Sequence, residues 1–171
     1  MPESASKAAA VEIGLGLGSN IGDKPGNIRR ALQLLEERNV ARLAAVSSIY
    51  RTKPWGYVNQ EDFANACALA QTTLDPLALL AAVKQVETDM GREPELRWGP
   101  RLIDIDLLFY GDTELALPEL TLPHKEIFNR AFVLVPLIEI APDLRLGGRS
   151  IKEAGVELAE GDVAKWENGQ P

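Results

Sequence analysis

The chain has 171 residues, of which 46% are apolar and 25% are charged. This composition indicates one folded globular domain and excludes a disordered chain. The formal net charge of −7, from 25 acidic and 18 basic residues, argues against nucleic acids and acidic membranes as partners.

The ends of the chain are predicted to be tails around a single domain. Residues 1–10 have no basic segment followed by an apolar one, and no stretch approaches the length of a membrane span. We therefore expect a cytoplasmic protein with a flexible tail at 1–10, a domain at 11–160 and a C-terminal tail at 161–171. We expect a monomer, with a weak dimer as the alternative. Cys67 lies in an apolar run without a basic neighbour, which predicts a buried, unreactive thiol.

The first predicted strand covers residues 11–18, an apolar segment interrupted by glycines, and a turn follows it. A helix is expected next, because apolar residues recur at helical spacing behind Asp23, which can cap the helix. Pro25 is acceptable in its first turn, and Asn39 marks its end.

The middle of the chain predicts a strand at 44–51, a long loop at 52–62 and then a segment, 63–72, whose alanines permit a helix and whose alternation permits a strand. We favour the strand. Asp75 and Pro76 form a typical helix start, and the apolar stripe behind them ends at Gly91.

The second half begins with a charged loop at 92–101, and an alternating strand at 102–110 follows it. Residues 129–141 predict a core helix in which Pro136 is acceptable only near the first turn or at a kink. Strands and helices that alternate in this way predict a sandwich built on one mainly antiparallel sheet.

Asp104 and Asp106 are the clearest candidates for chemistry. A two-residue step along a strand places both carboxylates on one face, about 7 Å apart. Magnesium is usually held by one or two carboxylates, with phosphates and waters in its other positions. The alternative is a solvated strand face, but Leu108 and Tyr110 are expected to continue the same face as apolar residues.

Three arginines, Arg92, Arg97 and Arg101, stand in the loop before these aspartates. The planar guanidinium group binds two phosphate oxygens and stays charged, so the cluster suggests phosphoryl transfer. A surface ion-pair network is the alternative. His124 is the only histidine, and it is either a phosphate-binding residue or an ordinary loop residue.

The glycines at 14, 16, 18 and 22 fit neither the dinucleotide fingerprint nor the phosphate-binding loop. They are expected to allow close backbone approach and the turn after the first strand.

Five segments, spread from Gly14 to about Asp143, resemble the 6-hydroxymethyl-7,8-dihydropterin pyrophosphokinase family. They are GLGSNIGD, SSIYRTKPWG, FANACAL, GREPELRWGPRLIDIDLLFYG and LPHKEIFNRAFVLVPLIEIAP. The resemblance implies an α+β fold, a ferredoxin-like three-layer α/β/α sandwich. It also implies transfer of a diphosphate from ATP to the hydroxymethyl group of the pterin, with release of AMP, in folate biosynthesis.

The same resemblance implies roles for individual residues. Asp104 and Asp106 would hold two Mg²⁺ ions, and Arg92 and Arg101 would be catalytic arginines. The pterin site would be formed by Thr52, Pro54, Trp55, Phe63, Asn65 and Phe132. ATP would be bound by Lys84, Glu87, Arg92, Trp98, Arg101, Leu107, Thr121, His124 and Arg130, with Trp98 on a loop that closes over the site.

Three features depart from the family pattern: the short acidic loop at 93–96, Lys84 in place of a common glutamine, and Glu119 in place of a basic residue near the nucleotide. Because the metal pair and the pterin residues are retained, we expect an active enzyme. The rival hypotheses are a non-catalytic binding module of the same fold and a metal-dependent phosphohydrolase. Neither accounts for the aspartates, the arginines and the pterin residues together.

Overall fold

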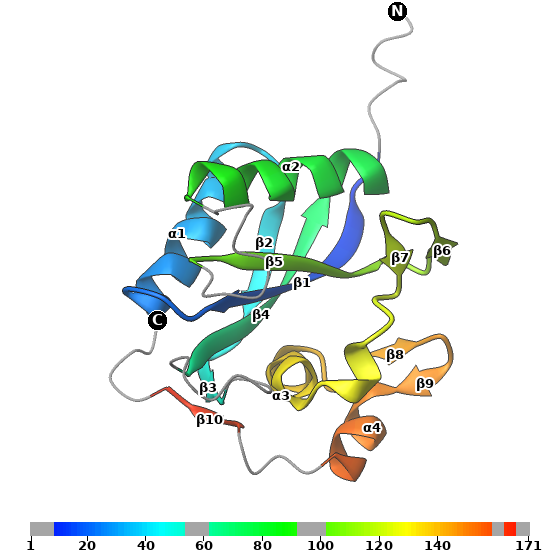
Figure 1. Ribbon diagram of the computed structural model, residues 1–171. Helices are drawn as coiled ribbons and strands as arrows, with labels where there is room; N and C mark the ends of the chain where they lie inside the picture. Colours follow the sequence, from blue (N-terminus) through cyan, green and yellow to red (C-terminus); the bar gives the residue numbers. More distant parts are fainter. Residues whose placement is uncertain (1–8, 54–61, 92–101, 159–162, 167–171) are drawn as a thin grey trace, which may run out of the picture.

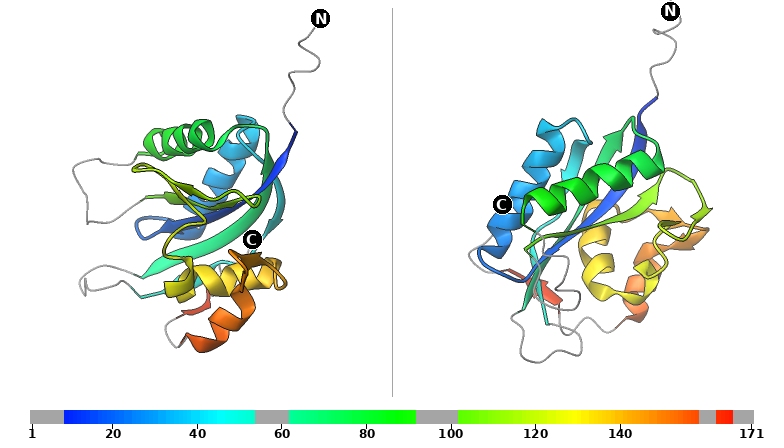
Figure 2. Two further views of the ribbon diagram at one scale, coloured as in Figure 1. Left: turned by 90° about the vertical axis from the view of Figure 1, so that its right-hand side faces the viewer. Right: turned by 45° about the horizontal axis from the view of Figure 1, so that its top comes forward.

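The computed structural model describes residues 9–53, 62–91, 102–158 and 163–166. In this part of the chain, a mainly antiparallel sheet is sandwiched between two pairs of helices (Figure 1). Helices α1 (Lys24–Glu37) and α2 (Pro76–Asp89) cover one face. Helices α3 (Ala131–Ile140) and α4 (Ile151–Glu157) lie on the other face, as both views in Figure 2 show.

The main sheet has six strands. They are β1 (Val11–Ser19), β2 (Arg42–Val46), β3 (Tyr50–Thr52), β4 (Phe63–Thr72), β5 (Asp104–Tyr110) and β10 (Val163–Lys165). Their order is β10-β3-β4-β1-β5, and β2 pairs with β4 next to β3. If β2 and β3 are counted as one strand, the chain from β1 to β5 follows the order βαββαβ. The four strands of this unit, numbered along the chain, then lie side by side in the order 4-1-3-2. This arrangement confirms the predicted α+β sandwich.

Two short hairpins lie outside the sheet. β6 (Leu115–Ala116) pairs with β7 (Thr121–Leu122), and β8 (Arg145–Leu146) pairs with β9 (Arg149–Ser150).

The predicted helix starts are confirmed by their caps. The Asp23 side chain accepts a hydrogen bond from the Gly26 amide at 3.1 Å, and that of Asp75 accepts one from the Ala78 amide at 2.8 Å. Segment 63–72 is a strand, as expected. It lies at the centre of the sheet, where its alternate residues face both helical layers.

The expected single strand at 44–51 is instead broken into β2 and β3. Both pair with β4, but Ser47, Ser48 and Ile49 interrupt the ladder. At the break, the Cys67 amide donates to Oγ of Ser47 at 2.9 Å, and the Ser47 amide donates to the Cys67 carbonyl at 2.9 Å. The serine side chain thus takes the place of a backbone acceptor.

Pro136 lies in the interior of α3, so of the two expected positions, the first turn or a kink, the first does not apply. One further expectation differs from the structure. The C-terminal segment was expected to be a tail from residue 161, but β10 pairs with β3, and the Trp166 indole lies 4.1 Å from the Arg51 guanidinium. The domain therefore extends at least to Trp166.

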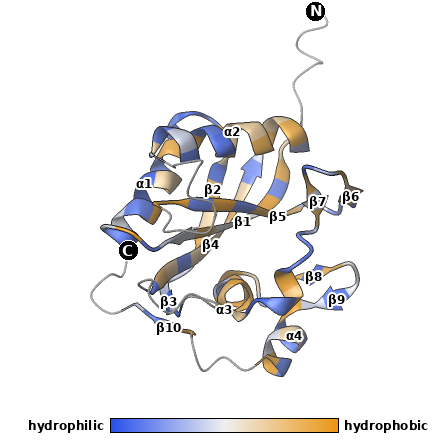
Figure 3. Ribbon diagram, in the orientation of Figure 1, coloured by the Kyte–Doolittle hydropathy of each residue, from blue (hydrophilic) through white to orange (hydrophobic). Residues whose placement is uncertain are grey.

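Apolar side chains form a separate core on each face of the sheet. The core under α1 and α2 includes Ile13, Leu15 and Val83, and the core under α3 and α4 includes Leu134 and Leu137. Figure 3 shows the apolar residues concentrated along the central strands and in α3. Among the described residues, no helix is long and apolar enough to cross a membrane.

Candidate active site

The face of β1 that looks toward α3 is made of glycines. A Cβ atom at Gly14 would overlap the Phe109 ring, one at Gly16 would lie 3.4 Å from Leu108, and one at Gly18 would lie 2.9 Å from Oδ1 of Asn65. The glycines therefore let side chains of the neighbouring strands lie across β1, where the sequence predicts a close approach of backbone. Gly22 has a φ of +71° in the turn that follows, which glycine adopts without strain.

One row of residues crosses the sheet from β3 to β5 on this face. The register pairs Tyr50 with Asn65, Asn65 with Gly18, and Gly18 with Asp104. Asn65 and Asp104 are two strand spacings apart, about 10 Å between Cα atoms. Because Gly18 has no side chain, no side chain stands above the sheet between the Asn65 amide and the Asp104 carboxylate.

At the β3 end of this row, Asn65 is held in one orientation. Its Nδ2 donates to Oγ1 of Thr52 at 2.6 Å, and both residues are buried. Phe63, which pairs with Thr52 in the sheet, is half-buried next to them. The structure thus brings together three of the residues expected to bind the pterin.

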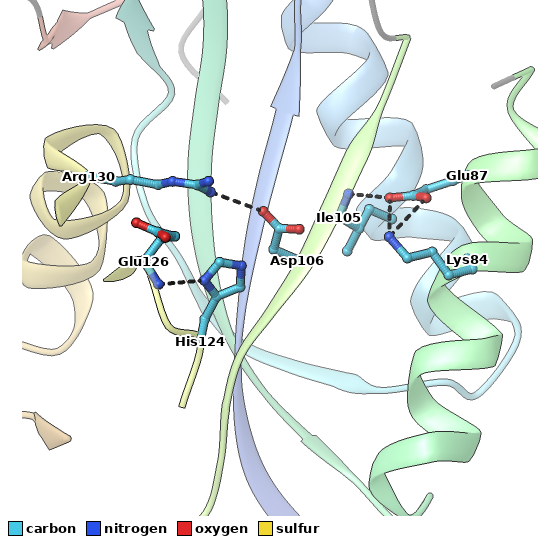
Figure 4. A network of polar contacts seen from close by, with 7 residues as sticks. All are labelled: Lys84, Glu87, Ile105, Asp106, His124, Glu126 and Arg130. Atoms are coloured by element: carbon cyan, nitrogen blue, oxygen red, sulfur yellow. Dashed lines mark hydrogen bonds and ion pairs between the residues drawn. The ribbon is translucent and has the colours of Figure 1, made fainter. Parts of the chain in front are cut away.

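At the β5 end, Asp104 and Asp106 are both half-buried, and the buried Ile105 between them faces the α1 and α2 core. The strand alternation thus places the two carboxylates on one face, as expected. Nη1 of Arg130 lies 4.0 Å from Oδ2 of Asp106 (Figure 4).

A β-bulge changes which residues share this face. Leu107 pairs with Leu15 and Phe109 with Gly14, so Leu108 is an extra residue in β5. Leu108 stays on the aspartate side. Tyr110 does not, because the bulge turns it toward α2, where its hydroxyl donates to the Leu74 carbonyl at 2.7 Å. The expectation that Tyr110 lies on the aspartate face was wrong.

The two carboxylates suit Mg²⁺. No group of three or more His, Cys, Asp or Glu residues that could bind a metal occurs within the described ranges. A cation held here by Asp104 and Asp106 would complete its coordination with phosphate oxygens and waters, which is the usual arrangement for Mg²⁺.

His124 is oriented toward the same face by its backbone. Its amide donates to the Leu108 carbonyl at 2.8 Å, and its Nδ1 accepts from the Glu126 amide at 3.1 Å. Burial and the nearby Arg130 charge lower the pKa of His124, which favours the neutral ring. Its proton then sits on Nε2, which can donate to an anionic oxygen.

Arg130 and Phe132 stand at the start of α3, where the guanidinium lies 5.6 Å from the centre of the ring. Arg130, His124 and Asp106 lie on one side of β5 in Figure 4. A cation, a neutral donor and a carboxylate pair are thus grouped at the edge of the sheet, where a phosphate chain would find positive charge.

Glu87 and Lys84 lie on α2, on the opposite side of β5 (Figure 4). Glu87 is 1% exposed, and its Oε2 accepts a hydrogen bond from the Ile105 amide at 2.6 Å. Nζ of Lys84 lies 3.4 Å from its Oε1. Glu87 therefore holds the peptide between the two aspartates. In the sequence, Glu87 follows Val83 by four residues and so lies next to the apolar stripe of α2. A glutamate at this position is the signal that could indicate a buried carboxylate.

Two other expected ATP residues lie near the same edge. The Leu107 side chain is buried in the α1 and α2 core, so only its backbone can meet a ligand. Thr121 is half-buried in β7. The remaining expected site residues lie outside the described residues: Pro54, Trp55, Arg92, Trp98 and Arg101, together with Arg97 and loop 93–96.

Cys67 is buried directly under the site, and its thiol donates to the Val133 carbonyl at 3.5 Å. Burial and the negative charge of Asp106 raise its pKa. The prediction of a buried thiol is confirmed, and the raised pKa disfavours the reactive thiolate form.

Comparisons with known proteins identify one family. Residues 14–142 match the family model described as 7,8-dihydro-6-hydroxymethylpterin-pyrophosphokinase. The chain is 45% identical to the 2-amino-4-hydroxy-6-hydroxymethyldihydropteridine pyrophosphokinase of Methylorubrum extorquens, over 90% of this chain and 97% of that protein. It is 45% identical to the protein of the same name from Pseudomonas aeruginosa, over 80% and 85%.

A solved structure also shares the fold. The chain matches the Plasmodium falciparum HPPK-DHPS with a TM-score of 0.71 and 16% identity, over 87% of this chain and 42% of that longer one.

Proposed function

The chain belongs to the 7,8-dihydro-6-hydroxymethylpterin-pyrophosphokinase family, and on that premise we propose how its own residues bind and align two substrates. The protein is an enzyme of folate biosynthesis that transfers diphosphate from ATP to 6-hydroxymethyl-7,8-dihydropterin and releases AMP.

The pterin binds across the row from Asn65 to Asp104. Asn65, oriented by Thr52, pairs with the polar edge of the ring, and Phe63 and Phe132 cover its two faces. The ring lies over Gly18, where no side chain obstructs it. Because the row is about 10 Å long, a bicyclic ring held at Asn65 directs its hydroxymethyl group toward Asp104. This row is the observation that carries the proposal.

Asp104 and Asp106 would hold two Mg²⁺ ions together with the ATP phosphates. Bound there, the ions would neutralise the phosphate charge and make the β-phosphorus more open to attack. Arg130 and the Nε2 proton of His124 bind the outer phosphate oxygens. Lys84, Thr121 and the backbone of Leu107 border the β5 edge, where ATP approaches, and the buried Glu87 fixes that edge through its bond to the Ile105 amide.

In the reaction, the hydroxymethyl oxygen forms a bond to the β-phosphorus, and the bond from that phosphorus to the oxygen of the α-phosphate breaks. AMP leaves with the electron pair, and the hydroxyl proton is released. Asn65 fixes the direction of attack, while Arg130 and His124 fix the diphosphate, so the chain acts mainly by alignment. Arg92, Arg101 and Trp98 are proposed to complete the site, with Pro54 and Trp55 bordering the pterin.

A phosphohydrolase would need the carboxylates but not the row from Asn65 to Gly18. The test is incubation with ATP, Mg²⁺ and the dihydropterin, followed by identification of the products. AMP and the pterin diphosphate are expected in equal amounts, and without Mg²⁺ neither should form. ADP as the product, or AMP formed at the same rate without pterin, would contradict the proposal.

We also propose that the enzyme acts as a monomer in the cytoplasm. Its net charge of −7 makes copies of the chain repel one another, which supports a monomer. Sedimentation equilibrium at micromolar concentration should give a mass near 18.6 kDa, and twice that mass would show a dimer.

A further inference from the structure

A group of hydrogen bonds on the α3 side of the sheet is not used by the proposed reaction. The carboxylate of Glu139, in α3, accepts bonds from three donors, two on Ser48 in the segment that joins β2 to β3 and one on Tyr50, the first residue of β3. These are the Ser48 amide, at 3.1 Å to both oxygens, the Ser48 hydroxyl at 3.0 Å, and the Tyr50 hydroxyl at 2.6 Å.

The break between β2 and β3 explains why an acceptor is needed there. Ser48 lies in the three-residue interruption of the ladder, where it has no partner in β4. Its amide would otherwise depend on water. A carboxylate can accept all of these bonds at once, which neither an amide nor a hydroxyl side chain does as well. Glu139 is also the only charged residue of α3, whose sequence is AFVLVPLIEI.

The bonds join the two walls of the pterin slot. Glu139 follows Phe132 by seven residues, which is about two helical turns, so both side chains lie on one side of α3. On the sheet, Tyr50 pairs with Asn65, and Thr52, two residues later, bonds to Asn65. A shift of α3 relative to β3 would therefore move Phe132 relative to Asn65.

The helix does not depend on Glu139 to stay on the sheet. Val133, Leu134 and Leu137 are at most 5% exposed and pack in the core below α3, while Glu139 is exposed. Apolar contacts are not directional and permit small sliding and rotation, whereas a set of short hydrogen bonds fixes one position.

We propose that Glu139 is a positioning residue for the pterin. By binding Ser48 and Tyr50, it fixes α3 against β3 and so sets the distance between Phe132 and the plane in which Asn65 holds the ring. The inference rests on the proposed pterin site, and it predicts that Glu139 affects the pterin and not ATP.

The test compares Glu139→Ala, Glu139→Gln and Tyr50→Phe with Glu153→Ala, which removes an exposed glutamate of α4 away from the slot. Equilibrium binding of the dihydropterin is measured with a saturating nonhydrolysable ATP analogue, together with KM for both substrates and the thermal midpoint. Glu139→Ala should weaken pterin binding about tenfold, with KM for ATP within about twofold. Glu139→Gln should recover part of the loss, and Glu153→Ala should match the parent in pterin binding.

Non-additivity gives a second readout. If Tyr50 acts through Glu139, the double variant Glu139→Ala/Tyr50→Phe should bind the pterin no more weakly than Glu139→Ala alone. Unchanged pterin binding in Glu139→Ala, or equal weakening of both substrates with a lower thermal midpoint, would overturn the inference. Asn65→Ala distinguishes a failure of the Glu139 inference from a failure of the proposed pterin site. If Asn65→Ala too leaves pterin binding unchanged, the proposed pterin site itself is wrong.

Discussion

Replacing Gly18 by alanine would place a methyl group 2.9 Å from Oδ1 of Asn65, closer than carbon and oxygen approach in ordinary contact. Asn65 would have to move, and with it the 2.6 Å bond from its Nδ2 to Thr52. A displaced amide no longer meets the polar edge of the pterin. We expect a loss of about 1.5 to 3 kcal/mol in pterin binding, or roughly tenfold to hundredfold.

Gly16→Ala is the matched control. It lies on the same face of the same strand, but its new methyl group would lie 3.4 Å from the flexible end of Leu108, an ordinary contact. Neither glycine has a positive φ, so alanine fits both backbones without conformational strain. Pterin binding should therefore fall in Gly18→Ala and remain close to the parent value in Gly16→Ala.

Pterin binding is measured by titration with a saturating nonhydrolysable ATP analogue, and the free energy of unfolding by urea denaturation. If Gly18→Ala binds the pterin as tightly as the parent, the row from Asn65 to Asp104 is not the pterin site. An equal loss in both variants would show that the effect comes from β1 as a whole rather than from contact with Asn65.

Asp104→Asn and Asp106→Asn should each lower the rate of AMP release about a thousandfold, or about 4 kcal/mol, and leave pterin binding without nucleotide unchanged; near-normal turnover would rule out the metal role. Burial raises the pKa of Glu139, but hydrogen bonds from Tyr50 and the serine beside it outweigh burial, so the net pKa is lowered. Above pH 4.5, the parent should therefore have a higher free energy of unfolding than Glu139→Gln. The parent should lose this advantage as the pH falls through the lowered pKa of Glu139. Urea denaturation at several pH values tests this expectation, and a difference that stays constant with pH would contradict it. Trp166→Ala should cost about 2 kcal/mol of unfolding free energy and Trp166→Phe less, because ring contacts at the β10 edge are lost; an unchanged urea midpoint would show that β10 adds little.

The sequence determined most of the local structure because the signals were local. Asp23 and Asp75 stand where helices begin, and the two-residue period of β5 placed Asp104 and Asp106 on one face before any fold was known. The family motifs extended over nearly the whole domain, so they also indicated the activity. The alternation of strands and helices predicted a sandwich on one mainly antiparallel sheet, and the family resemblance implied its three layers.

The tertiary structure decided what depends on pairing between distant segments. The bulge at Leu108 turned Tyr110 to the other face, because strand alternation holds only while the register is unbroken. The contacts of Glu139 with Ser48 and Tyr50 join residues about ninety positions apart. The sequence predicts a tail where β10 forms, because three residues carry too little periodicity to mark a strand. A sequence pattern records the preferences of neighbouring residues, whereas register, bulges and edge pairing are fixed by partners that come together only when the sheet forms.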